Sequence, residues 1–326
     1  MPSKARTMSP RRSRRARRHA RIAGVAFLAL LAASCDNEPA AVTNPPTAAE
    51  EVTQGPPPPT PSDAPVDDPA TDETEVSGEL LAEKAGDETC TEGGDVSRCV
   101  GAPWEGDYSM SDPRLSGPME VTFNFEMGPG DRFRWWYAGA LRNDSGTWEG
   151  LNLGEIRSSG VHAGEGVWLE TGPNAGLEFH EHTYLGPGAV TSQGDMFEVT
   201  GFIHPVAVDG WEFDPAAPNG AREAVLAVTR AWNSGHADAA ARLYAEDAAF
   251  VDTDGSTTVG RSDIASLVER SAEAGFAIEL LPPVVVNGNY AAAAFHWTTD
   301  EDEGWMLGVF RFDEAGLILQ QEVIAA

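Results

Sequence analysis

Basic side chains are scarce in this chain of 326 residues, and many of them lie at one end. Nine of the 22 Lys and Arg residues fall within residues 1–34, which contain no Asp or Glu. The rest of the chain has 13 basic against 51 acidic side chains, a charge of about −38. Phosphate binding requires clustered Lys and Arg. This balance therefore excludes a nucleic-acid partner bound through a basic surface, and it disfavours adhesion to anionic lipid by charge alone.

Several sequence motifs of catalysis are also missing. The chain has no Gly-rich phosphate loop, no Gly-x-Ser-x-Gly motif and no His-Glu-x-x-His motif. Their absence argues against nucleotide-binding, esterase and protease activities. With 41% hydrophobic residues, the chain still has enough apolar material for a core in part of its length, and its length favours two folded units.

The N-terminal segment has the pattern of an export signal. The basic run ends at Arg21, and residues 22–33 are uncharged and apolar. This stretch is shorter than the ~20 residues that span a bilayer, but it has the length of a signal-peptide core. A buried core helix is the alternative, although nine uncompensated positive charges at one end oppose it. We predict a signal peptide over residues 1–34.

Small residues precede the first cysteine: Leu31, Ala32, Ala33 and Ser34 lead to Cys35. This run resembles the lipobox of bacterial lipoproteins, in which the cysteine is lipidated and becomes the mature N-terminus. Ala32 stands where the pattern prefers Leu. The resemblance implies that Cys35 carries fatty acid such as palmitate and anchors an extracytoplasmic protein in the bacterial cell membrane. The alternative is ordinary cleavage and release of a secreted protein.

Two further cysteines, Cys90 and Cys99, remain after Cys35. An even pair in an exported chain favours a disulfide, and closing this short loop stabilises the fold by roughly 2–3 kcal/mol in the chain-entropy model.

The segment after Cys35 is poor in aromatic residues and rich in proline and acid. Residues 36–88 hold ten of the 23 prolines and fourteen acids against Lys84 alone, and no Phe, Trp or Tyr occurs between Asp36 and Pro103. Such a segment buries too little apolar area to offset its ordering entropy. We predict a disordered tether over residues 35–88, in which residues 79–84 form at most one helical turn.

Residues 89–212 have the texture of an all-β domain. Residues 119–127 alternate cleanly, with Val121, Phe123 and Phe125 on one face, which is typical of a half-buried strand. Similar runs occur at 132–141, 146–156, 165–171, 176–185 and 195–206. Short antiparallel strands in this number predict a small closed barrel or a sandwich, and their count and Gly/Trp spacing loosely resemble the barrels of allene-oxide-cyclase-like and dirigent-like proteins.

Glu178, His180 and His182 alternate along one of these runs and therefore share a face. Two histidines and a carboxylate can offer ligands to zinc or iron, with His162 or His204 as a further ligand. Alternating polar residues also describe a solvated strand face, so we expect no metal and no other cofactor here.

In residues 213–326 the sequence pattern predicts helices first and strands after them. Apolar positions predict amphipathic helices at 221–232, 237–244 and 262–274, and strands follow at 276–285, 289–299, 304–313 and 316–325. Helices followed by a meander of strands indicate an α+β fold.

The run AWNSGHADAAARLYAEDAAFVDTDGSTTVGRSDI (231–264) resembles the SnoaL-like branch of the NTF2-like superfamily. The ending VFRFDEAGLILQQ (309–321) is similar to the family's closing hairpin. The resemblance covers about residues 216–326. It implies a cone, in which a curved antiparallel sheet wraps around helices and encloses an apolar pocket.

The resemblance also assigns roles to residues. Superfamily members that isomerise steroids use a carboxylate base at the end of the first strand, and a Tyr and a protonated acid as oxyanion donors. By motif the base position falls on Asp252, the Tyr position on Val228 and the acid position on Gly308. Losing one such donor costs on the order of 3 kcal/mol of transition-state stabilisation, so steroid-isomerase chemistry is not expected.

Two interpretations of Asp252 stay open. As a general base it would be buried against Phe295 and Trp297, and burial would raise its pKa. As a turn residue it would belong to the Asp-Thr-Asp-Gly run that it opens.

The resemblance implies a pocket lined by Val228, Ala293, Phe295, Trp297, Gln321 and Val323, for which core packing is the alternative. We therefore expect a membrane-anchored module that binds a small apolar ligand, without established catalysis. The alternatives are a lyase, isomerase or cyclase that uses Asp252 as its base, and an assembly module that forms homodimers through the outer face of the sheet.

Overall fold

The computed structural model describes residues 73–129, 132–156, 162–172, 175–186, 189–191, 194–206, 211–217 and 220–325. These residues belong to one compact unit, Thr71–Ala326, which is distinct from Met1–Ala70. The predicted signal peptide, Cys35 and most of the predicted tether lie outside the described residues. Within the described part, no helix is both long enough and apolar enough to cross a membrane.

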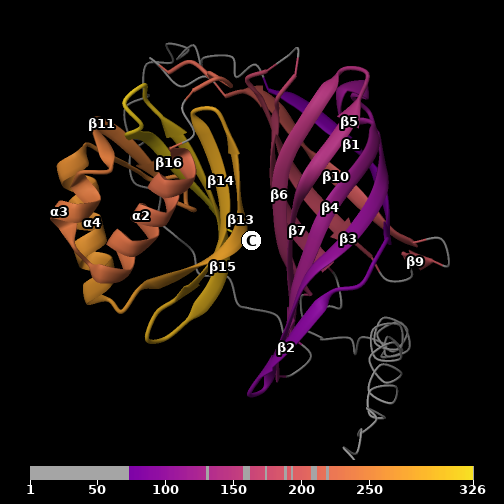
Figure 1. Ribbon diagram of the computed structural model, residues 1–326, viewed down its shortest axis with the longest axis horizontal. Helices are drawn as coiled ribbons and strands as arrows, with labels where there is room; N and C mark the ends of the chain where they lie inside the picture. Colours follow the sequence, from indigo (N-terminus) through magenta and orange to yellow (C-terminus); the bar gives the residue numbers. More distant parts are fainter. Residues whose placement is uncertain are drawn as a thin grey trace, which may run out of the picture. The chain divides into compact units, whose positions relative to one another are not determined.

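The first domain is a closed antiparallel barrel of eight strands (Figure 1). Around the barrel the strand order is β1-β10-β8-β7-β6-β5-β4-β3, and pairing of β1 with β3 closes the ring. The prediction of an antiparallel barrel is thus confirmed. The strands are β1 (Thr74–Lys84), β3 (Val96–Met110), β4 (Gly117–Met127), β5 (Phe133–Asn143), β6 (Gly146–Ile156), β7 (His162–Glu170), β8 (Leu177–Leu185) and β10 (Gly194–Pro205).

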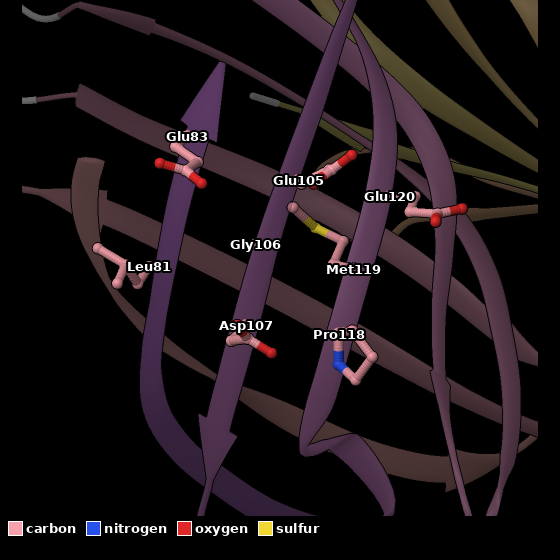
Figure 2. Close-up of a pocket in the computed structure, with 8 residues that line it drawn as sticks. All are labelled: Leu81, Glu83, Glu105, Gly106, Asp107, Pro118, Met119 and Glu120. Carbon is pink, nitrogen blue, oxygen red and sulfur yellow. The ribbon is translucent and has the colours of Figure 1, made fainter. Parts of the chain in front are cut away.

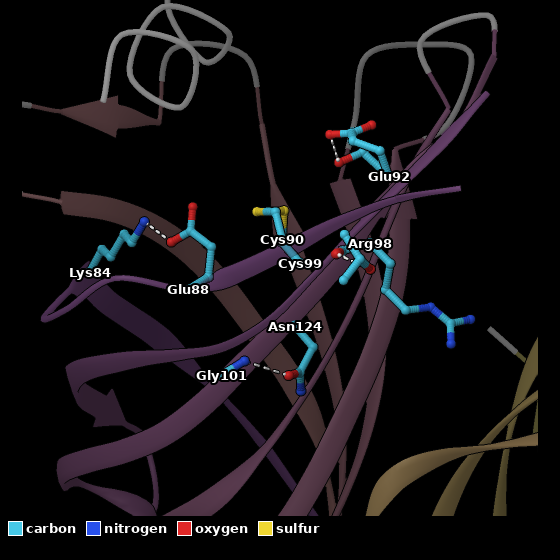
Figure 3. Close-up of a disulfide and its surroundings, with 10 residues drawn as sticks. Lys84, Glu88, Cys90, Glu92, Arg98, Cys99, Gly101 and Asn124 are labelled. Atoms are coloured by element: carbon cyan, nitrogen blue, oxygen red, sulfur yellow. Dashed lines mark hydrogen bonds and ion pairs between the residues drawn. A yellow bond between two sulfur atoms is a disulfide. The ribbon is translucent and has the colours of Figure 1, made fainter. Parts of the chain in front are cut away.

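Three short elements complete this domain. Strand β2 (Thr89–Gly93) pairs with β3, β9 (Val190–Thr191) pairs with β10, and the 3-10 turn η1 (Pro113–Leu115) links β3 to β4. A disulfide between Cys90 and Cys99 joins the directly opposed residues of β2 and β3, with a Cα–Cα distance of 4.0 Å (Figure 3).

Strand β1 is the main departure from the sequence-based expectation. Residues 73–88 were expected to belong to a disordered tether, but residues 74–84 form a barrel strand that pairs with β10 and β3. The reason is an alternation of small and aliphatic residues: Val76, Leu80 and Ala82 face the barrel interior and are at most 5% exposed. The acids between them face outward, so the high acid content hid a half-buried strand.

The C-terminal domain is a curved six-stranded sheet with helices in its concave side (Figure 1). The strand order is β12-β11-β16-β15-β14-β13, in which β11 and β16 run parallel and the other pairs are antiparallel. The elements are α2 (Ala221–Ser234), α3 (Ala237–Ala241), β11 (Tyr244–Val251), β12 (Thr257–Val259), α4 (Arg261–Glu273), β13 (Ala277–Asn287), β14 (Tyr290–Thr298), β15 (Glu303–Phe312) and β16 (Ile318–Ala325). The α+β prediction is confirmed.

Helix α2 shows why these elements form where they do. Val225, Val228, Ala231 and Trp232 repeat at helical spacing and are buried against the sheet. The helix ends at Gly235, whose φ of 63° is left-handed and suits glycine at this position. The next helix is shorter than predicted, because Tyr244 is fully buried and already belongs to β11.

The outer face of this sheet packs against the outer face of the barrel. One apolar cluster joins barrel residues such as Trp136 and Leu153 with sheet residues such as Leu281, Trp305 and Leu307. The Nε1 atom of Trp136 donates a hydrogen bond to the carbonyl of Pro282 across this contact, at 2.9 Å. The two domains therefore share a core, distinct from the interior of either one.

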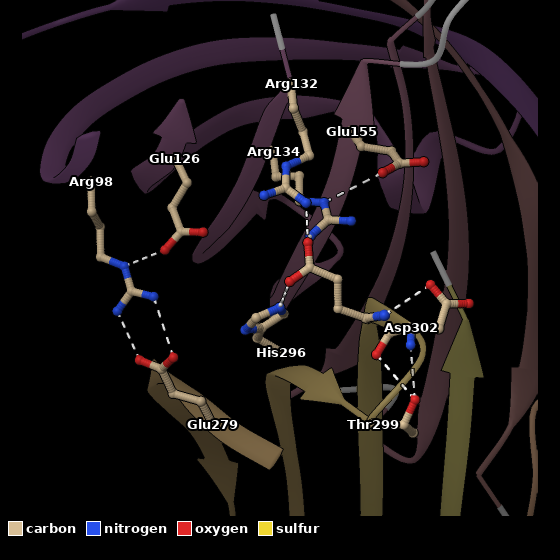
Figure 4. Close-up of polar contacts among 10 residues, drawn as sticks. Arg98, Glu126, Arg132, Arg134, Glu155, Glu279, His296, Thr299 and Asp302 are labelled. Atoms are coloured by element: carbon tan, nitrogen blue, oxygen red, sulfur yellow. Dashed lines mark hydrogen bonds and ion pairs between the residues drawn. The ribbon is translucent and has the colours of Figure 1, made fainter. Parts of the chain in front are cut away.

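Charged side chains border this shared core (Figure 4). Arg98 of the barrel lies between Glu126 and Glu279, and its Nη1 is 2.8 Å from a carboxylate oxygen of Glu279. Arg132 pairs with Glu303 of β15 in the same way. Exposed pairs of this kind contribute little stability each, about 0–1 kcal/mol.

Candidate functional site

Aromatic rings of the C-terminal domain contact one another in a series that runs from the half-buried Trp297 into the core. Trp297, which is half-buried, stacks on Phe276 with ring centroids 6.3 Å apart. Phe276 meets Trp232 edge to face at 5.8 Å, and Trp232 lies 5.5 Å from Phe250. Such a wall is the usual lining of a small-molecule site.

A hydrogen-bonded pair lies deeper in the same interior. The hydroxyl of Tyr244 donates to Oε1 of Gln321 at 2.5 Å, and Nε1 of Trp232 reaches that hydroxyl at 3.5 Å. Tyr244 is fully buried and Gln321 is 6% exposed. Burial raises the pKa of Tyr244 well above its usual value, so this hydroxyl is a neutral donor throughout the physiological range.

The pocket residues expected from the sequence all lie in or beside this interior. Val228, Phe295, Gln321 and Val323 are buried, and Trp297 is half-buried at the edge of this core. They come from α2, β14 and β16, and their side chains pack on one another. In the described structure they form the core of the domain.

Asp252 lies elsewhere. It is exposed at the end of β11, where its backbone bonds with Ser256 and Gly255 close a turn and its Oδ1 accepts from the amide of Thr253 at 2.7 Å. The burial against Phe295 and Trp297 that a general base would need is not found, because the turn directs this residue to solvent. Its observed contacts are those of a turn residue.

Comparison with known proteins identifies a family for the C-terminal domain. Residues 225–321 match the family model of the SnoaL-like domain. The C-terminal domain is a SnoaL-like domain. No protein with curated annotation matches the chain.

Solved structures are similar to about a third of the chain. An NTF2-like protein of unknown function from Burkholderia xenovorans is 23% identical, with 32% of this chain and 81% of that chain covered and a TM-score of 0.28. One from Cytophaga hutchinsonii is 15% identical, with 36% and 94% covered and a TM-score of 0.29. A provisionally assigned ketosteroid isomerase from Kribbella flavida is 15% identical, with 32% and 77% covered and a TM-score of 0.30.

Two positions of the SnoaL-like domain show what its interior lacks. Val228 and Gly308 are the positions that the family resemblance assigned to oxyanion donors, and neither side chain can donate a hydrogen bond. At Gly308 an added Cβ would lie 2.9 Å from the ring of Phe295 and 3.0 Å from that of Phe310. The space that an acidic side chain would need is therefore filled by phenyl rings.

The barrel has a buried polar group that the sequence reasoning missed. Glu181 is 1% exposed and points into the barrel, where it accepts hydrogen bonds from Tyr108 at 2.5 Å, Trp168 at 2.8 Å and Asn152 at 3.1 Å. Tyr137 lies at 3.5 Å. The alternation that puts His180 and His182 on the outer face puts Glu181 on the inner one, so this position was readable from the strand period.

On the outer face of the same strand, the three residues that the spacing offered as candidate metal ligands do not stay together. His182 has half of its side chain exposed and pairs with Glu165 of β7. Glu178 and His180 stay together and are joined by His204 of β10, and these three form the group of the described residues that could hold a metal ion. Glu178 is fully buried, and Arg311 of the SnoaL-like domain lies 3.4 Å from its carboxylate.

A surface hollow of about 250 Å³ lies on the barrel across β1, β3 and β4 (Figure 2). Its lining includes Glu83, Glu105, Asp107 and Glu120, with no basic side chain among its lining residues. Arg142 donates to Glu120 from outside this lining, at 3.0 Å. The hollow is acidic and polar, and it does not resemble the apolar interior of the SnoaL-like domain.

Proposed function

We propose that the SnoaL-like domain binds a small apolar molecule and that the chain presents this domain outside the cytoplasm, from a lipid anchor at Cys35. The observation that carries the ligand proposal is the aromatic series from Trp297 to Trp232, which ends at the single buried pair of Tyr244 and Gln321. SnoaL-like and NTF2-like domains commonly bind small molecules, which supports the same conclusion.

The ligand enters at the half-buried end of this series. Trp297 and Phe276 now fill the space there, and both are only partly buried, so they can move aside at less cost than the fully buried Phe295. Apolar contacts between the ligand and these rings then replace the contacts that the rings make with each other. A polar group on the ligand can bond with Gln321, whose amide nitrogen has no acceptor among the described residues.

Catalysis receives less support from the same residues. Asp252, the general base that the family resemblance offered, is exposed and lies away from the apolar interior. Oxyanion donors are absent at Val228 and Gly308. The proposed function is accordingly binding.

Titration with the fluorescent apolar probe ANS tests this proposal. We expect one probe molecule per folded chain, and Trp297→Leu should weaken its binding about tenfold, a loss of about 1.4 kcal/mol. The matched control is Trp104→Leu, which removes a half-buried tryptophan that stacks on Phe123 in the barrel. Binding that is absent from the wild type, or that both variants lose equally, would refute the proposal.

Anchoring rests on residues 1–35, which lie outside the described structure. The basic, apolar and small-residue runs that precede Cys35 support it. We expect labelled palmitate to be incorporated into the wild-type protein in its bacterial host and to be lost in Cys35→Ala. The Cys90→Ala/Cys99→Ala variant is the control for cysteine loss, and it should keep the label. An unlabelled wild-type protein recovered from the medium would favour secretion instead.

A further inference from the structure

Three potential ligands for a metal ion meet on two neighbouring strands of the barrel. Glu178 and His180 are two residues apart on β8 and share its outer face. His204 lies directly opposite Glu178 on β10 in the antiparallel register. One ligand atom from each residue can be chosen so that all lie within 4.8 Å of one another.

The two imidazoles point at the same carboxylate oxygen. Oε1 of Glu178 is 2.5 Å from Nε2 of His180 and 3.3 Å from Nε2 of His204. A tetrahedral zinc ion about 2.1 Å from each donor holds its donors about 3.4 Å apart. His204 already has this separation from Glu178, and His180 needs to withdraw by about 1 Å.

The hydrogen bonding of His204 favours a metal ligand over an ordinary buried histidine. Its Nδ1 lies 2.9 Å from the carbonyl of Pro205, so Nδ1 carries the proton and donates. In the neutral ring this leaves the lone pair on Nε2, which is buried and has no hydrogen-bond partner within the described part of the chain, since its contact with Glu178 lacks hydrogen-bonding geometry. A backbone carbonyl that fixes the far nitrogen is the usual second contact of a metal-bound histidine.

His180 is held in place from one side. Its ring stacks on Phe202 with centroids 4.8 Å apart and an interplanar angle of 22°. The side chain of His180 is 12% exposed and that of His204 is 22% exposed, while Glu178 is inaccessible. The two strands therefore hold the three donors close together, mostly out of water.

The charges nearby come from the SnoaL-like domain. Nη2 of Arg311 lies 3.4 Å from Oε2 of Glu178, and Nη1 of the same residue lies 3.5 Å from Glu322. Glu322 offsets the charge of Arg311, so the second acid reduces the repulsion that a cation would meet. The hydroxyl of Tyr290 is buried, and it has no partner with hydrogen-bonding geometry among the described residues.

We propose that Oε1 of Glu178 and the Nε2 atoms of His180 and His204 bind one zinc ion at the junction of the two domains. Two imidazole nitrogens and a carboxylate oxygen form a zinc donor set, whereas calcium and magnesium prefer all-oxygen sites. Oε2 of Glu178 stays with Arg311, as a metal-bound carboxylate commonly keeps a second contact. Three protein ligands leave a fourth coordination position open to water.

Zinc titration by calorimetry, on full-length protein purified without a histidine tag and stripped with a chelator, tests this site. We expect one zinc ion per chain, and His204→Ala and His180→Ala should each weaken binding more than about 100-fold, the upper end of the loss from a second-shell partner. The matched control is His182→Ala, on the same strand face but paired with Glu165. It should change the affinity less than about twofold.

Cobalt(II) in the wild-type protein provides a readout that needs no variant. Occupancy of the site gives the visible absorption of tetrahedral cobalt with nitrogen and oxygen ligands, and zinc should abolish it. Wild-type protein that takes up no stoichiometric zinc, or a His182→Ala variant that loses as much affinity as His204→Ala, would overturn the proposal. The three residues would then be a charge cluster between the domains.

Discussion

Glu178 and Glu181, three residues apart on one strand, are both buried and have opposite surroundings. Burial alone raises the pKa of Glu178, but the charge of Arg311 and the nearby imidazoles of His180 and His204 outweigh it and hold that pKa well below its usual value. For Glu181 burial also dominates, and the bonds from Tyr108 and Trp168 offset it only in part, so its pKa is raised. Both acids are buried, so it is the neighbouring charge that makes their pKa values shift in opposite directions.

The raised pKa of Glu181 predicts how barrel stability depends on pH. The folded state holds the Glu181 proton more tightly than the unfolded state does, so the contribution of Glu181 is fully present below its unfolded pKa, near 4.5, and falls as the pH rises through the folded value. Glu181→Gln mimics the protonated acid and should remove this part of the pH dependence. Urea unfolding of both proteins at a series of pH values measures the difference, and parallel curves would contradict the prediction.

The matched variant for that experiment is Glu181→Leu. It leaves the hydroxyl of Tyr108, the indole N–H of Trp168 and the amide of Asn152 without their acceptor inside the barrel. Each unpaired buried group costs about 1–3 kcal/mol. We therefore expect a loss of at least about 3 kcal/mol for Glu181→Leu at any pH, well beyond the loss for Glu181→Gln.

At the scale of elements, local periodicity decided what could be predicted. Strands β4 to β8, β10 and β13 to β16 and the longer helices were expected close to where they lie, because alternation and helical spacing are properties of adjacent residues. No alternating run was recognised over β3 or β11. Strand β1 was missed because its few inward-facing apolar residues, Val76, Leu80 and Ala82, are interrupted by a serine, a glycine and an acid and flanked by further acids. Composition over a long window indicated disorder, while the two-residue period indicated a strand.

The sites needed information that no local pattern contains. Glu178 and His180 were recognised from their spacing, but the third member, His204, is placed by the register of β8 against β10. His182 was favoured on spacing alone and instead pairs with Glu165 on β7. Likewise, matching by motif gave Asp252 its position at the end of β11, and the turn that exposes it is set by bonds to Ser256.

At the scale of the molecule, the outer face of the SnoaL-like sheet is the surface to consider. The dimer hypothesis from the sequence assigned this face to a second copy of the chain. In the structure the barrel of the same chain covers it, and Leu281, Tyr290, Trp305, Leu307 and Val309 are at most 6% exposed. A homodimer through this face would require the barrel to leave it. In the intact chain, the barrel already buries this apolar surface.

The SnoaL-like domain, when separated from the barrel, should therefore self-associate. A folded fragment of residues 213–326 exposes the side chains that the barrel covers, and each buried Leu, Val or Trp of such a face is worth roughly 1.5–3 kcal/mol. Light scattering should report dimers or larger species for this fragment and monomers for residues 73–326. Trp305→Glu in the fragment places a charge at the centre of the face and should restore the monomer. A wild-type fragment that stays monomeric would show that the barrel is not needed to keep the sheet from pairing.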